Sequence, residues 1–159
     1  MSLEKLKTAE QLASIRDELG VEGRKLVFTN GVFDLLHVGH VRYLQQAREL
    51  GDALVVAVIG DAGVRELKGP TRPINSEQDR AEVLSALECV TYVTIFPTIR
   101  VTEMVRMVRP QVYAKGGDYT VDSLNQEERV VLEAVGSEIR ILPLVPGKST
   151  TAIIGKWKN

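Results

Sequence analysis

Residues 25–50 read KLVFTNGVFDLLHVGHVRYLQQAREL, and this stretch decides the fold. The first five residues, Lys25–Thr29, form a short apolar run that predicts a buried strand, and residues 40–50 carry apolar side chains at helical spacing. A glycine-bearing turn joins them and contains both histidines of the chain, His37 and His40. Because a helix N-terminus exposes unpaired N–H groups and partial positive charge, this strand, turn and helix predict an anion site.

The rest of the chain alternates predicted helices with predicted strands. Apolar spacing and the capping residues Thr8 and Ser76 predict helices over residues 8–20, 61–66, 77–87, 101–108, 122–135 and from Ser149 onward. Apolar runs predict strands over residues 53–59, 92–96, 111–115 and 138–142. This alternation indicates the α/β class, a Rossmann-like three-layer α/β/α sandwich with a central parallel sheet. We expect a single domain over residues 1–159, with residues 1–22 as an N-terminal helix leading into the core.

Composition argues against several classes of protein. The 159 residues carry a net charge of −1, so no chain-wide basic field favours a nucleic acid or an anionic membrane, and we expect neither partner. The longest apolar run, residues 53–59, is too short to span a bilayer, and residues 1–7 lack the apolar core of a signal peptide. A single cysteine, Cys89, cannot form an internal disulfide. These features are typical of a cytoplasmic protein.

Cations are predicted to gather at one edge of the sheet. Right-handed crossovers place the loops after parallel strands around one crevice. Here those loops are residues 29–40, 68–73, 115–119 and 146–151. They contain Lys68, Arg72, Lys115 and Lys148 besides the two histidines. In a nearly neutral protein, such convergence favours polyphosphate binding over four independent solvated charges.

These loops also match parts of two other kinds of site. Residues 147–150 resemble the end of a P-loop, but Leu142 stands where its first glycine belongs. Asp34, His37 and His40 could form a metal-binding facial triad, yet no further histidine or nearby cysteine completes a site, so we assign no metal ligands. Residues 149–151 fit two roles equally, as helix N-caps or as hydroxyl donors to phosphate.

Residues 31–40 match the Gly-x-Phe-Asp-x-x-His-x-Gly-His signature of the nucleotidylyltransferase superfamily, which the chain therefore resembles. The likeness to adenylyltransferases that act on heptose 1-phosphate in bacterial surface-sugar synthesis extends over residues 28–37, 67–75, 79–84, 115–119 and 142–151. It implies transfer of AMP from ATP to a sugar 1-phosphate by direct in-line attack, giving an ADP-sugar and pyrophosphate. It also implies Mg²⁺ carried mainly by the substrate phosphates, a homodimer, and a stand-alone form of a domain that is often fused to a sugar kinase.

The resemblance further implies roles for individual residues. His37 and His40 would contact the triphosphate, and Lys68 would bridge it to the attacking phosphate. The implied nucleotide-binding residues are Thr29, Asn30, Gly31, Phe33, Asp34, Gly39, Lys115, Gly116, Asp118, Lys148, Ser149, Thr150 and Thr151. The implied acceptor-binding residues are Asp34, Lys68, Arg72 and Arg80. One departure is Ile59-Gly60, where the family usually has a polar pair after the second strand, and it bears on recognition of the acceptor.

Two other functions stay open on the sequence. One is a CTP-dependent cytidylyltransferase of an alcohol phosphate such as glycerol 3-phosphate, although residues 146–150 differ from the Arg-Thr-x-x-Ile-Ser-Thr pattern usual in those enzymes. The other is a non-catalytic nucleotide-binding protein, because binding residues alone do not establish turnover.

Overall fold

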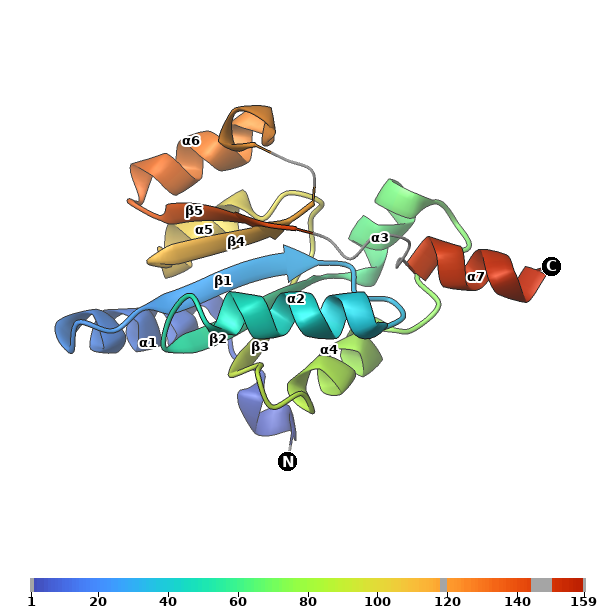
Figure 1. The fold of residues 1–159 in the computed structure, drawn as a ribbon, viewed down its shortest axis with the longest axis horizontal. Helices are drawn as coiled ribbons and strands as arrows, with labels where there is room; N and C mark the ends of the chain where they lie inside the picture. Colours follow the sequence, from blue (N-terminus) through green and yellow to red (C-terminus); the bar gives the residue numbers. More distant parts are fainter. Residues whose placement is uncertain (1, 118–119, 144–149, 159) are drawn as a thin grey trace.

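The computed structural model describes residues 2–117, 120–143 and 150–158. Its centre is a five-stranded sheet in the order β3-β2-β1-β4-β5, with all neighbouring strands parallel and helices packed around it (Figure 1). The strands are β1 Leu26–Gly31, β2 Ala53–Ile59, β3 Tyr92–Phe96, β4 Val112–Gly116 and β5 Glu138–Leu142. The helices are α1 Ala9–Val21, α2 Val38–Arg48, α3 Asp61–Lys68, α4 Glu77–Ser85, α5 Thr102–Val108, α6 Gln126–Ala134 and α7 Thr150–Lys158, with 3-10 turns at Ser2–Lys5 and Val121–Ser123. The predicted α/β sandwich is confirmed.

Strand β2 is the clearest link between sequence and packing. All seven of its residues are buried, as the unbroken apolar run predicts for a strand covered on both faces. Alternate side chains point to opposite faces, so Val55 joins the core cluster that contains residues of α1, α5 and α6, while Val56 joins the cluster with residues of α2 and α4. Two helical layers therefore enclose the sheet.

Capping residues fix where the helices begin. Thr8 and Gln11 form the capping box predicted for α1, and the Ser76 hydroxyl accepts the Asp79 N–H at the start of α4. The expectation of one helix over residues 122–135 is wrong at its start. The backbone is extended at Leu124, and α6 begins after Asn125, whose side chain accepts the Glu128 N–H.

The strand order creates a switch point between β1 and β4. From β1 the chain adds β2 and β3 on one side, whereas β4 and β5 lie on the other. Loops that leave such neighbours diverge and open a crevice beyond the carboxyl ends of the strands. At the far edge of the sheet, the Lys7 N–H donates to the Val93 carbonyl of β3, so the chain before α1 lies along that strand. No helix among the described residues is long and apolar enough to cross a membrane.

Candidate functional site

The candidate site lies at the carboxyl ends of β1 and β4. Strand β1 leads through residues 32–37 into α2, and β4 ends at Lys115 and Gly116, so both predicted loops leave the sheet at the switch point. Figure 1 shows α3 and α7 on the side toward which the β1 arrow points. The fold therefore brings the loop after β1, the end of β4 and the start of α7 to one side of the sheet.

The two histidines form a stacked pair at the start of α2. Their ring centroids lie 3.9 Å apart, with 28° between the ring planes. His37 caps the helix, because its Nδ1 accepts the Gly39 N–H at 3.0 Å, and Nδ1 of His40 accepts the His37 N–H at 3.3 Å. These bonds assign the proton of each neutral ring to Nε2, which makes Nε2 the donor atom of both side chains.

Packing keeps His40 neutral. Burial, with a smaller contribution from the neighbouring His37, lowers the pKa of His40 to about 4. The ring also lies against Phe33, with 5.4 Å between centroids, and Phe33 itself is held at a positive φ of 50°. A Cβ on Gly31 would stand 2.8 Å from the Phe33 ring, so glycine at this position leaves room for that aromatic support. At neutral pH, His40 can therefore act as an uncharged hydrogen-bond donor.

Two tyrosines that the sequence analysis did not select support the end of β1. The Tyr43 and Thr29 hydroxyls lie 2.7 Å apart, and the Tyr113 hydroxyl donates to Oδ1 of Asn30 at 2.6 Å. Burial raises the pKa of Tyr43 to about 12 and raises that of Tyr113 well above its ordinary value, so both hydroxyls keep their protons. Thr29 and Asn30 are thus fixed from within the protein. Their contact with a nucleotide stays a prediction.

The Asp34 side chain forms hydrogen bonds with other residues of the protein. Its fully buried carboxylate accepts the Arg72 Nε–H at 2.8 Å and the backbone N–H groups of Ile74 and Asn75 at 2.9 Å. Burial alone would raise the pKa of Asp34, but these donors together lower it below its ordinary value, so the carboxylate is ionised at neutral pH. Its oxygens face the 72–75 segment, which argues against the facial triad with His37 and His40.

Arg80 lies in the interior, with a relative exposure of 1%. Its guanidinium donates to the carbonyls of Val32 and Ile59 at 2.8 and 2.7 Å, to the Asn75 carbonyl at 3.0 Å, and to the Asp61 carboxylate at 2.8 Å. These bonds join the ends of β1 and β2 to the start of α3 and the loop before α4. We interpret Arg80 as a structural residue, and the predicted contacts of Arg80 and Arg72 with an acceptor stay predictions without support from these bonds.

Some of the remaining predicted residues are described by the structure, and others lie outside the described residues. Lys68 ends α3 and is exposed, and its ammonium has no hydrogen bond or ion pair with another described residue. Gly39 is buried in the first turn of α2. Thr150 and Thr151 begin α7, and Thr151 is exposed. Asp118, Lys148 and Ser149 lie outside the described residues, so their predicted contacts with the nucleotide are not examined by this structure.

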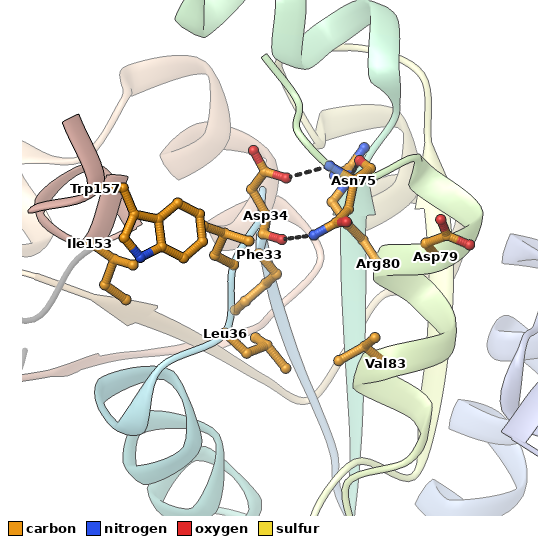
Figure 2. Close-up of a pocket in the computed structure, with 10 residues that line it drawn as sticks. Phe33, Asp34, Leu36, Asn75, Asp79, Arg80, Val83, Ile153 and Trp157 are labelled. Atoms are coloured by element: carbon orange, nitrogen blue, oxygen red, sulfur yellow. Dashed lines mark hydrogen bonds between the residues drawn. The ribbon is translucent and has the colours of Figure 1, made fainter. Parts of the chain in front are cut away.

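A pocket of about 240 Å³ lies between the loop after β1, α4 and α7 (Figure 2). Six of the lining side chains are apolar, and the four polar ones come from the loop after β1, from α4 and from the loop before α4. The lining residues are Phe33, Asp34, Leu35, Leu36, Asn75, Asp79, Arg80, Val83, Ile153 and Trp157. Sequence reasoning did not select Asn75, Ile153 or Trp157. Helical spacing in the tail offered the only signal, because Ile153 and Trp157 are four residues apart and share one face of α7.

Comparison with known proteins identifies the family. The cytidylyltransferase-like family model matches residues 28–156. The bifunctional protein HldE of Syntrophotalea carbinolica is 50% identical over 144 residues, covering 89% of this chain and 29% of that protein. HldE of Geotalea uraniireducens is 48% identical over 155 residues, covering 98% of this chain and 31% of that protein. The chain thus spans about a third of the length of these curated relatives.

Solved structures show the same fold. A lipopolysaccharide core biosynthesis protein from Thermoplasma volcanium superposes with a TM-score of 0.63 at 29% identity, covering 77% of this chain and 98% of that chain. Pantoate-beta-alanine ligase from Francisella tularensis, solved with β,γ ATP and β-alanine, superposes with a TM-score of 0.57 at 15% identity, covering 87% and 66%. The second likeness concerns the fold alone.

Replacement of Arg80 tests its structural role. We expect Arg80→Lys to lower the free energy of unfolding by about 3 kcal/mol, because one ammonium cannot satisfy three carbonyls and a carboxylate from a buried position. Urea unfolding measures the change. The control is Arg106→Lys, which alters an exposed pair with Glu103 and should change stability by less than about 0.5 kcal/mol. A loss below about 1 kcal/mol for Arg80→Lys would contradict this role.

The depressed pKa of His40 predicts a pH-dependent stability. Below pH 6.5 the unfolded chain protonates this ring, whereas the folded chain does so only near pH 4, so acid favours unfolding over that interval. We expect the stability of the wild type relative to His40→Asn to fall by about 1 kcal/mol between pH 7 and pH 5, after allowance for partial solvent exposure. Urea unfolding at both pH values measures it, and a constant difference between the two proteins would exclude the effect.

Proposed function

The chain belongs to the cytidylyltransferase-like family of nucleotidyltransferases, and we propose that it transfers AMP from ATP to a sugar 1-phosphate. Heptose 1-phosphate is the acceptor that we propose, and the products are an ADP-sugar and pyrophosphate. The resemblance of residues 67–75 and 115–119 to heptose 1-phosphate adenylyltransferases supports this choice. The description of the Thermoplasma volcanium protein as a lipopolysaccharide core biosynthesis protein is consistent with a sugar acceptor.

The observation that carries the proposal is the stacked histidine pair at the N-terminus of α2. A helix N-terminus favours negative charge, and two imidazoles with protons on Nε2 add donors that strengthen as charge develops. The pair lies at the start of α2, directly after the loop that follows β1 at the switch point where this class of sheet binds its ligands. A triphosphate is the ligand that suits this arrangement best.

The proposed reaction needs no general base. A sugar phosphate monoester is largely dianionic at neutral pH, because its second pKa is near 6. One of its oxygens attacks the α-phosphorus of ATP in line, a new P–O bond forms, and the bond to the bridging α–β oxygen breaks. Pyrophosphate leaves with that electron pair. The protein must therefore hold two anions together and stabilise charge on the α-phosphate and the leaving group.

Lys68 is the cation that we assign to this task. Arg72 and Arg80 are engaged with Asp34 and Asp61, whereas the Lys68 ammonium has no bond to another described residue. Among the described residues, no group of three or more His, Cys, Asp or Glu side chains could hold a metal ion. We propose that Mg²⁺ arrives with ATP as part of the substrate, because phosphate oxygens are ligands that Mg²⁺ prefers. The homodimer and the cytoplasmic location stay predictions.

Pyrophosphate release is the direct test of the proposed function. Purified protein is incubated with ATP or CTP and with a panel that contains both anomers of heptose 1-phosphate, other sugar 1-phosphates and glycerol 3-phosphate. We expect release with ATP and a heptose 1-phosphate. Release only with CTP and glycerol 3-phosphate would support the cytidylyltransferase instead. Nucleotide binding without release under any pairing would indicate a non-catalytic protein.

Replacement of His40 tests its part in the reaction. We expect His40→Ala to lower kcat by on the order of a hundredfold, because one donor to the developing charge is lost. The matched control is Val38→Ala, an exposed side chain in the same turn, which should leave kcat within about twofold. Circular dichroism establishes that both variants fold. Near-normal turnover by His40→Ala would remove this residue from the mechanism.

A further inference from the structure

The carboxylate of Asp34 joins two segments that are far apart in the sequence. Its oxygens accept three donors from residues 72–75, and the Asn75 amide Nδ2 donates back to the Asp34 carbonyl at 2.8 Å. Figure 2 shows Asp34 and Asn75 facing one another, with their hydrogen bonds as dashed lines. Hydrogen bonds from Arg72, Ile74 and Asn75 thus hold the segment 72–75 against Asp34.

One of the joined segments follows Lys68 directly. Helix α3 ends at Lys68, and Gly69 turns the chain with a positive φ of 103°. The Arg72 N–H then donates to the Gly69 carbonyl at 3.2 Å, so only a short turn separates Lys68 from the residues that Asp34 holds. The backbone of Lys68 is therefore fixed on one side by α3 and on the other by the bonds of Asp34.

The other joined segment carries the histidine pair. Asp34 precedes His37 by three residues, in the loop between β1 and α2. Its side chain is 0% exposed and all its bonds are internal, so a phosphate could reach it only by displacing Arg72. Two anions would also repel one another at that position. Direct contact of Asp34 with either substrate is therefore disfavoured by this geometry.

We propose that Asp34 is a positioning residue for Lys68. By holding residues 72–75 against the loop before His37, it sets where the backbone that carries Lys68 stands relative to His37 and His40, and so limits the positions that the Lys68 ammonium can reach. This inference rests on the proposed function, in which Lys68 bridges the two phosphates. Arg80 also stabilises the position of Asn75, because its guanidinium donates to the Asn75 carbonyl at 3.0 Å.

A double-mutant cycle tests the inference. We expect Asp34→Asn to lower kcat/KM for the sugar phosphate by on the order of tenfold to a hundredfold, because misplacement by about 1 Å costs that much. In a Lys68→Met background the same change should cost less than about twofold, since the residue it positions is gone. Multiplicative losses in the double variant, or full activity of Asp34→Asn, would overturn the inference.

Amide hydrogen exchange measures the contact between Asp34 and residues 74–75 independently of turnover. In Asp34→Asn, the Ile74 and Asn75 amides should exchange faster than in the wild type, because they lose an ionised acceptor. Asp17→Asn is the matched control, since it weakens surface pairs with Arg16 and Arg109 and should change neither turnover nor these amides. Unchanged exchange in Asp34→Asn would count against the inference.

Asn75→Ala covers the case in which Asp34→Asn does not fold. It removes only the bond from Asn75 Nδ2 to the Asp34 carbonyl. We expect a loss of a few fold, about threefold to tenfold, that likewise disappears in the Lys68→Met background. A loss of the same size in the Lys68→Met background would again overturn the inference. A wild type that releases no pyrophosphate with any pair of substrates would instead overturn the proposed function, and the inference with it.

Discussion

The backbone carbonyls of Val32 and Ile59, at the ends of β1 and β2, are satisfied by one buried guanidinium. A buried carbonyl without a donor costs about 1 to 3 kcal/mol, so Arg80 makes it possible for both strands to end inside the protein. The same side chain donates to Asn75 and Asp61. Its position in the interior therefore determines how three separate loops meet at the edge of the sheet.

From Arg80, a chain of hydrogen bonds reaches the residues that face the crevice. Asn75 accepts from Arg80 and donates to Asp34, and Asp34 accepts from Arg72. Three residues beyond Asp34, His37 caps α2 and stacks on His40. The imidazoles are held by their contacts with each other, with Phe33 and with the backbone at the start of α2. Such preorganisation is what stabilisation of developing charge requires.

The sequence predicted the fold well because its signals are local. Alternating apolar runs and the caps at Thr8 and Ser76 do not depend on distant residues, whereas the Asn125 cap that begins α6 was overlooked. The two histidines were also correctly placed together, since they are three residues apart at a helix start. Partners of charged residues were not predictable. The structure pairs Arg72 with Asp34 and Arg80 with Asp61 through tertiary packing, while the predicted contacts of both arginines with an acceptor stay predictions.

These internal pairs change the electrostatics of the crevice. With Arg72 and Arg80 neutralised by Asp34 and Asp61, the positive charge offered to phosphates falls below what the sequence suggests. Burial adds to this by keeping His40 uncharged near neutral pH. A nucleotidyltransferase must release pyrophosphate, and a cluster of fixed cations would hold that product as firmly as the transition state. In the proposed mechanism, a neutral donor such as His40, whose hydrogen bond strengthens as charge develops, would favour the transition state over the bound product.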